Sequence, residues 1–322
     1  MVTRVLSPFV HSTARGFLQF DSEVRVPASA QARIQIMSAS QKISIVTPSF
    51  NSINTIRETI ESVLKQGYSN WEHIIMDGGS TDGTLKVLKE YSHLQWSSEK
   101  DEGHYHAMNK GISQTTGEFI LILNSDDCFR PHALSTAINA FETNPTWDGL
   151  FGDVIFVDGK SQEIYRRVEA VYDYNVLRFA LDYICHHTLF VRKEVYNRLG
   201  GYRHKEFLNS ADFEFKLRLG KFGCQIGHVP KFLVNYRYHS FGQSADVRII
   251  RNMAKESAII QREYGNPGGW IGKGLKTCFK AKRQIQKLVI RGQCDFVPGT
   301  WRLRSHMQAK TNFSSNSGLD KL

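Results

Sequence analysis

The sequence predicts an α/β fold in which a mostly parallel sheet is flanked by helices. Two observations point to it. Between residues 42 and 123, short apolar runs of strand length alternate with longer runs whose apolar residues recur at helical spacing. After residue 129 the alternation becomes irregular, which predicts a mixed second half of the same domain.

The first half, 42–128, is predicted to repeat a strand–helix unit with right-handed crossovers. Its clearest strand is the unbroken apolar run 119–123, which is typical of a strand buried on both faces. The other expected strands are 42–47, 72–76 and 94–98, and the expected helices are 55–66, 81–91 and 104–114. Polar or small residues end all four strands. In such sheets ligands bind beyond the carboxyl ends of the strands, so a nucleotide fits this edge.

The second half, 129–264, is expected to build the floor for a second substrate. The segment 209–220 is expected to be a helix, although its alternating apolar residues also fit a strand. The other expected helices are 131–144, 172–181 and 195–199, and the expected strands are 149–157, 162–168, 186–191 and one or two within 222–238.

Composition narrows the class of protein. The 322 residues carry a net charge of +10, but eleven Lys and Arg against two Asp follow Gly265, so the body is close to neutral. The body also has no nucleic-acid-binding signature, which speaks against that function. No apolar stretch is long enough to cross a bilayer, and residues 1–41, a poorly defined leader, lack a secretory core. Five scattered cysteines predict reduced thiols in a cytoplasmic protein.

Two adjacent acids, Asp126 and Asp127, follow the buried strand 119–123 almost at once. Neighbouring carboxylates repel each other and are costly to desolvate, so a cation should compensate them. A hard divalent ion with oxygen ligands, Mg²⁺ or Mn²⁺ carrying phosphates, is the simplest choice. The alternative is a loop whose acids only cap the following helix.

Residues 265–322 are predicted to be a basic helical appendage with a disordered tail from 305 onward. Within 273–291 the apolar residues gather roughly on one helical face, with most bases elsewhere. A basic amphipathic helix can lie on the inner, anionic face of the cell membrane. The alternative is a helix packed on the domain with its lysines in solvent.

Six motifs follow one another in a fixed order. They are Thr-Pro-Ser-Phe-Asn at 47–51, Met-Asp-Gly-Gly-Ser-Thr-Asp-Gly-Thr at 76–84, Ser-Glu-Lys-Asp-Glu-Gly at 98–103 running into Ala-Met-Asn-Lys-Gly at 107–111, Gly-Glu-Phe-Ile-Leu-Ile-Leu-Asn-Ser-Asp-Asp at 117–127, Cys-His-His-Thr-Leu-Phe at 185–190 and Ser-Ala-Asp-Phe-Glu-Phe at 210–215. Together they resemble the family 2 glycosyltransferases, in the branch that builds bacterial surface polysaccharides, over about residues 42–244.

The resemblance implies a GT-A fold, which is Rossmann-like, and a metal-dependent hexosyltransferase-type enzyme. Such an enzyme moves a sugar from a UDP- or GDP-sugar to a hydroxyl of a saccharide or lipid-linked acceptor, with inversion at the anomeric carbon. The residues implied to contact the nucleotide sugar are Thr47, Pro48, Asn51, Asp77, Gly79, Asp101, Asn109 and Asp126. The implied metal ligands are Asp127, Asp126 and, as a further candidate, His239.

On the acceptor side, the resemblance implies that Asp212 is the catalytic base. His186 is an acceptor-side candidate, and the alternative is a buried histidine whose ring is satisfied by the backbone. Two departures from the family pattern fall here: Ala211 stands where many members have a second acid, and His187 where this branch often has Gln. One base without a protein nucleophile implies inversion.

Other interpretations stay open at this point. Asp77 could simply end a strand in a Gly turn, and Asp212 could be an ordinary acid favoured by a helix N-terminus. The whole chain could be a non-catalytic nucleotide-sugar or saccharide binding module, because fold does not guarantee activity. An adaptor driven by the basic tail is a third class, which the near-neutral body disfavours.

Overall fold

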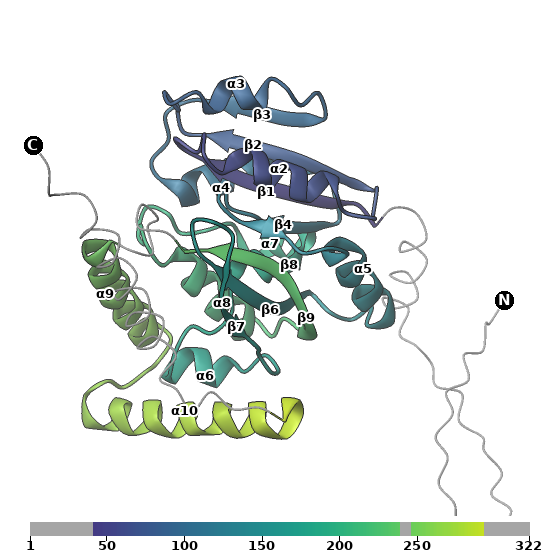
Figure 1. Cartoon of the computed structure of the whole chain (residues 1–322). Helices are drawn as coiled ribbons and strands as arrows, with labels where there is room; N and C mark the ends of the chain where they lie inside the picture. Colours follow the sequence, from purple (N-terminus) through teal and green to yellow (C-terminus); the bar gives the residue numbers. More distant parts are fainter. Residues whose placement is uncertain (1–40, 239–245, 293–322) are drawn as a thin grey trace, which may run out of the picture.

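The computed structural model describes residues 41–238 and 246–292 (Figure 1). Within them, one sheet of nine strands runs through the molecule and helices cover both of its faces. The predicted leader up to residue 40, His239 and the predicted tail 305–322 lie outside the described residues.

The sheet joins a parallel half to a mixed half. Its strand order is β3-β2-β1-β4-β8-β6-β9-β5, and β7 pairs with β6. The strands are β1 (Ile43–Ser49), β2 (Trp71–Asp77), β3 (Leu94–Ser98), β4 (Phe119–Ile122), β5 (Cys128–Phe129), β6 (Gly149–Val157), β7 (Glu163–Arg167), β8 (Phe190–Arg192) and β9 (Ile226–Arg237). The first four pair in parallel, as the sequence predicts, whereas β8 lies antiparallel to both β4 and β6.

Alternating side chains of the buried strands pack into a hydrophobic core on each face of the sheet. Val46 and Ile120 pack on one face, whereas Ile45 and Leu121 pack on the other. The helices are α2 (Ile56–Leu64), α3 (Thr84–Leu88), α4 (His104–Gln114), α5 (Ala133–Thr143), α6 (Tyr174–Phe179), η1 (His186–Thr188, a 3₁₀ turn), α7 (Lys193–Leu199), α8 (Ala211–Lys221), α9 (Val247–Glu263) and α10 (Gly269–Arg291). Helices α4, α6, α7 and α8 cover the first face, and α2 and α5 cover the second.

Four elements differ from the sequence prediction, among them the two-residue strand β5, which the sequence did not predict. The predicted strand 186–191 begins as the turn η1, because Thr188 N and Oγ1 both donate to the carbonyl of Cys185. The predicted helix 81–91 is shortened to α3, because the Asp82 carboxylate accepts from the backbone N–H groups of Ile53 and Thr84 and holds the chain in a turn. Helix α9 is an element that the analysis did not predict.

Helix α10 lies along the lower edge of the molecule in Figure 1, against α6. The alternative in which its lysines are in solvent is wrong for Lys287, whose side chain is only 2% exposed. Among the described helices, none combines the length and the apolar character that crossing a bilayer requires.

Candidate active site

Asp212 lies in the first turn of α8 and is held by three donors. Its Oδ1 accepts a hydrogen bond from the Tyr105 hydroxyl at 2.5 Å, and its Oδ2 accepts one from Lys216 Nζ at 2.9 Å. His186 Nδ1 lies 3.2 Å from the same Oδ2. Burial acts to raise the pKa of Asp212, but Lys216, His186 and Tyr105 outweigh it and hold that pKa well below the usual value. Asp212 is therefore an ionised carboxylate.

The neighbouring histidines of η1 connect this acid to Asp127. His186 faces Asp212, and the next residue, His187, places Nδ1 2.6 Å from Oδ2 of Asp127. The two imidazole rings are 3.7 Å apart between centroids. Asp212 and Asp127 thus lie on either side of the adjacent residues His186 and His187, although 85 positions separate the two acids in the sequence.

His186 is neutral in this arrangement. Burial, with His187 adding to it, lowers the pKa of His186 to about 3, even though Asp212 opposes the shift. A neutral ring beside a carboxylate carries its proton on the facing Nδ1, which leaves Nε2 with a lone pair. That Nε2 is buried and has no hydrogen-bond partner among residues 41–238 and 246–292, so it can accept from a hydroxyl group.

Asp127 is buried, and its carboxylate contacts His187 and the backbone of Arg237. Its Oδ1 accepts from the backbone N–H of Arg237 at 2.8 Å. Its Oδ2 lies 2.6 Å from Nδ1 of His187, within hydrogen-bond and ion-pair range. Burial raises the pKa of Asp127, and the charge of Asp127 raises the pKa of His187, so the pair retains a proton. Part of the compensation that the sequence analysis assigns to a metal comes from the chain itself.

The donor types at this point are ones that a divalent metal accepts. A carboxylate oxygen of Asp127 and an imidazole nitrogen of His187 lie 2.6 Å apart, so an ion bound here would replace the proton that the pair shares. Asp126 adjoins it, and its backbone carbonyl accepts from the Arg237 side chain at 2.9 Å.

The loop after β2 is organised by Asp77. Its two oxygens accept from the N–H groups of Gly79 and Ser80, from the Ser80 hydroxyl and from the Ser98 hydroxyl, at 2.5–3.0 Å. Asn51, with φ of 49°, joins the same loop through its side-chain carbonyl, which accepts from Thr81 N at 2.9 Å. Both residues therefore shape the backbone at the predicted nucleotide edge, and Gly79 supplies a φ of 88° there.

The buried carboxyl end of β1 packs beneath the predicted nucleotide edge of the sheet. Thr47 and Pro48 are buried, and the Thr47 hydroxyl lies 2.9 Å from His73 Nε2 on β2. Asp101 comes close to the β2 loop because residue 78 is glycine: a Cβ there would stand 2.8 Å from the Asp101 carboxylate. These residues lie along the carboxyl ends of β1 and β2, as the sequence predicts.

Asn109 makes a different contact from the predicted one. Its amide donates to the carbonyl of Tyr202 at 2.8 Å and accepts from the Tyr202 N–H at 2.8 Å. A Cβ at Gly201 would stand 2.2 Å from its oxygen, so only glycine fits beside it. Asn109 fastens α4 to the 201–204 segment of the second half.

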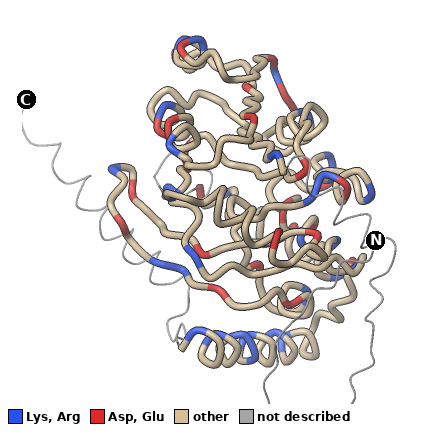
Figure 2. Tube along the Cα trace, turned by 90° about the vertical axis from the view of Figure 1, so that its right-hand side faces the viewer, with Lys and Arg blue, Asp and Glu red and all other residues tan. Residues whose placement is uncertain are grey.

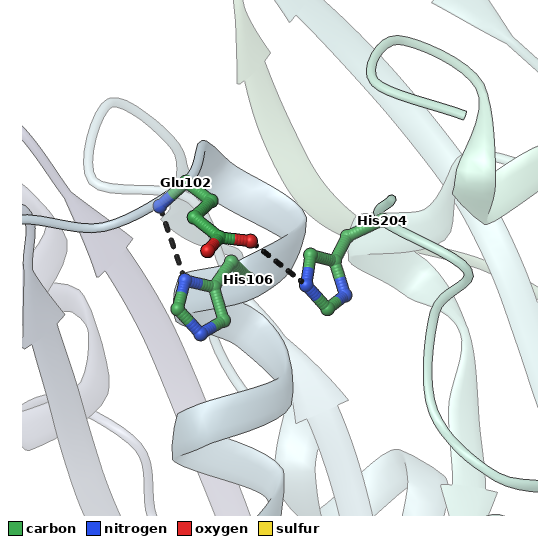
Figure 3. A group of neighbouring side chains, drawn as sticks. All are labelled: Glu102, His106 and His204. Atoms are coloured by element: carbon green, nitrogen blue, oxygen red, sulfur yellow. Dashed lines mark hydrogen bonds and ion pairs between the residues drawn. The ribbon is translucent and has the colours of Figure 1, made fainter. Parts of the chain in front are cut away.

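Beside this fastening, Figure 3 shows Glu102, His106 and His204 pointing toward one another from the two halves. Glu102 Oε2 lies 3.6 Å from His204 Nε2, and the Glu102 N–H donates to His106 Nδ1 at 3.0 Å. The two imidazoles are stacked, with centroids 4.9 Å apart and planes 10° from parallel. Because ring lone pairs lie in the ring plane, stacked rings do not aim at one common ion, so we interpret this group as a contact between the halves.

Comparison with known proteins adds to this geometry. The family description "Glycosyl transferase family 2" matches residues 44–200. An uncharacterized glycosyltransferase of Mycobacterium tuberculosis is 30% identical over 192 residues, which cover 56% of this chain and 70% of that protein. The chain belongs to glycosyl transferase family 2.

Other relatives of this family 2 chain have assigned roles. A PGL/p-HBAD biosynthesis glycosyltransferase of Mycobacterium tuberculosis is 29% identical over 273 residues, 83% of this chain and 99% of that protein. Among solved structures, Staphylococcus aureus TarS (residues 1–349) in complex with UDP-GlcNAc superimposes with a TM-score of 0.53 at 18% identity, over 75% of this chain and 80% of that one. This likeness confirms the GT-A-like fold.

Several residues of this family 2 site were not singled out from the sequence. Tyr105, Lys216 and Arg237 all touch the candidate acids, yet none lies in an acidic or glycine-rich motif. For Lys216 a signal existed, because Asp212 and Lys216 stand four residues apart and so share a helical face. His187 was noted only as a departure from the family pattern.

Proposed function

We propose that the chain transfers a hexose from a UDP- or GDP-sugar to a hydroxyl of a saccharide or lipid-linked acceptor, with inversion at the anomeric carbon. The observation that carries the proposal is the convergence of Asp212 and Asp127 on the adjacent pair His186–His187. It supports a reaction in which Asp212 acts as the base and Asp127 on the diphosphate side of one sugar.

Two relatives support this substrate class by what they are named for. One is the mycobacterial PGL/p-HBAD biosynthesis enzyme, and another is the O-antigen biosynthesis protein RfbC of Myxococcus xanthus, which is 30% identical over 218 residues, 65% of this chain and 17% of that protein. The TarS structures contain UDP and UDP-GlcNAc, which favours a UDP-sugar for this chain. We therefore place the reaction in glycolipid or polysaccharide biosynthesis.

In the proposed mechanism, Asp212 takes the proton of the attacking acceptor hydroxyl. Tyr105 and Lys216 fix the orientation of its carboxylate, so the base needs no rearrangement at the moment of attack. The buried Nε2 of His186 accepts from a second acceptor hydroxyl and positions the sugar. Attack by the acceptor on the face opposite the nucleotide gives inversion, because no protein nucleophile intervenes.

On the donor side, we propose that Asp127 and Asp126, with His187 adjacent, hold Mn²⁺ or Mg²⁺. The ion supplies charge that neutralises the leaving diphosphate. The loop that Asp77 and Asn51 organise lies at the carboxyl ends of β1 and β2, where we propose that the nucleotide binds.

The donor half of the proposal is tested with Asp127→Ala. We expect the metal-dependent part of nucleotide affinity to fall by roughly 10–100-fold, measured by calorimetry with UDP and Mn²⁺. The control is Asp158→Ala, an acid in the β6–β7 turn. Unchanged UDP affinity with metal present in Asp127→Ala would count against the metal site.

The reaction itself is tested with a panel of nucleotide sugars in Mn²⁺ or Mg²⁺, following release of nucleoside diphosphate. We expect release with one donor class and an increase when a saccharide or lipid-linked acceptor is added. Donor binding without release for any donor and acceptor combination would favour a non-catalytic binding module instead.

A further inference from the structure

Helix α10 packs on the protein with its basic side. Arg283 and Lys287, only 3% and 2% exposed, both face the carboxylate of Glu169, and Arg283 also lies over the Tyr183 ring at 3.3 Å. At the end of the helix, Arg291 binds Asp153 at 2.7 Å. The charges that a surface helix normally turns to water are used here to fasten it to the domain.

The opposite side of α10 is apolar and exposed. We call Trp270, Cys278, Ala281, Ile285, Leu288 and Val289 the outer stripe. Trp270 is 83% exposed, Ile285 61%, Leu288 51% and Val289 77%, and Cys278 and Ala281 are exposed as well. No residue of the stripe is charged. A surface helix of a globular protein shows the reverse arrangement, with its apolar side toward the core.

We propose that the outer stripe of α10 inserts into the headgroup region of an anionic lipid bilayer. An exposed apolar strip along a whole helix marks a contact surface, because leaving it in water costs free energy in proportion to its area. Lys273, Lys276 and Lys280 are exposed on the same helix but share the face of Lys287 rather than that of the stripe, so they add positive charge near the bilayer without lying in the contact itself. Trp270, with an apolar ring and a polar N–H, suits the interface itself.

The positive charge of α10 favours an anionic bilayer as the partner of the stripe over a second copy of α10 or the chain after residue 292. Between Gly269 and Arg291 the helix carries seven Lys and Arg and no acid, which Figure 2 shows as blue positions without red ones. Two copies of α10 packed stripe to stripe would pair helices that each carry this positive charge, with no carboxylate on either helix to offset it. The chain after residue 292 has four Lys and Arg and two Asp, so it is also net positive.

The inverted orientation explains how a helix with this much positive charge can present an apolar surface. Glu169 and Asp153 of the domain neutralise the buried bases of α10. The apolar outer stripe therefore faces away from the domain and is free to contact lipid. The contact surface is thus rigidly joined to the β6–α6 region. This inference does not depend on the catalytic assignments above.

The test is flotation of the full chain with vesicles of phosphatidylcholine alone and of equal parts phosphatidylcholine and phosphatidylglycerol. We expect the wild-type chain to float with the anionic vesicles. Replacing Ile285 and Leu288 together by Asp should reduce the vesicle-bound fraction at least about tenfold, because two side chains lose their burial in lipid. The matched control replaces Leu208 and Phe222 by Asp; these are 60% and 59% exposed but lie outside α10.

A second variant separates the electrostatic part. Changing Lys273, Lys276 and Lys280 to Gln should weaken flotation with anionic vesicles and leave UDP affinity unchanged. The proposal is overturned if the wild-type chain stays with the unbound protein, or if the Ile285/Leu288 variant floats like the wild type. It is also overturned if light scattering shows that this variant converts a dimer into a monomer, which would make a second copy the occupant.

Discussion

The side chain of Asp212 shows how one carboxylate can be held ready as a base. Tyr105, Lys216 and His186 all point toward it, and together they keep it ionised. The same contacts lower the pKa of Asp212, so the carboxylate is a weaker base than one whose pKa matches the working pH. Orientation, more than a matched pKa, is therefore what this site provides.

This balance predicts a shift in the pH profile of Tyr105→Phe. The Tyr105 hydroxyl lowers the pKa of Asp212, so removing it should raise that pKa. A base works only when deprotonated, and activity is lost as the pH falls through its pKa. The acid limb of kcat against pH should therefore move to higher pH in the variant, while activity at pH 8 stays within about tenfold of wild type. An acid limb that stays in place would show that Asp212 is not the group that titrates.

At the scale of elements, Asn109 is one of the side chains that hold α4 against the 201–204 segment. Asn109 uses both ends of its amide on Tyr202 and also contacts His204 Nδ1 at 3.1 Å. The resemblance implied a nucleotide contact for this residue, whereas the described contacts all lead to the second half of the domain. We expect its main effect to be on stability.

Asn109→Ala should lower the free energy of unfolding by about 1–3 kcal/mol, because it leaves the buried backbone groups of Tyr202 without their partners. Urea unfolding measures this directly. His204→Ala, which removes only one of the contacts, is the matched control and should cost less. If Asn109→Ala keeps full stability but loses UDP affinity, the nucleotide contact is right and the fastening is not.

The sequence predicted the regular elements better than the turns and the outer helices. Strand β4 is readable because it is apolar throughout, and the parallel order follows from the alternation of strands and helices. The turn η1 was predicted as a strand. It forms through hydrogen bonds from Thr188 to the carbonyl of Cys185, and the spacing of apolar residues carries no information about such local bonds. Helix α9 was missed, although its apolar residues also recur at helical spacing.

The site was predictable as a list of acids but not as a geometry. Asp126, Asp127 and Asp212 stand in recognisable motifs, whereas their partners Tyr105, Lys216 and His187 were not assigned such roles from sequence. The resemblance implies ligand contacts for Asp77 and Asn109, and the structure adds protein contacts that the sequence did not reveal, to Gly79 and to Tyr202. Which surface a side chain faces depends on tertiary packing, and this is what the sequence alone does not specify.

For the whole molecule, the placement of α10 depends on a buried carboxylate. Glu169 faces Arg283 and Lys287, and a second acid, Asp153, faces Arg291. Isolated buried charges are costly, so the attachment of the helix depends on these matches. Of the bases in the helix that the sequence predicts, Arg283, Lys287 and Arg291 are ion-paired with the domain.

Glu169→Gln should loosen α10 by about 3–5 kcal/mol, because it leaves two buried bases without this carboxylate. Hydrogen exchange across residues 269–291 should become faster while exchange in β1 and β4 stays slow. Lys280→Gln changes an exposed base on the same helix and serves as the control. Equal protection of α10 in Glu169→Gln and wild type would show that other contacts hold the helix.

The central claim is that Asp212 and the donor-side acids act on one sugar. Turnover of Asp212→Asn in the presence of metal and the donor identified by the panel tests it most directly, with UDP affinity measured on the same sample. Asp182→Asn is the matched control, because Asp182 also binds Lys216, at 2.5 Å, and no described contact joins it to His186. We predict that kcat of Asp212→Asn falls by about 10²–10⁴-fold with UDP affinity retained. Turnover close to wild type in that variant would contradict the account.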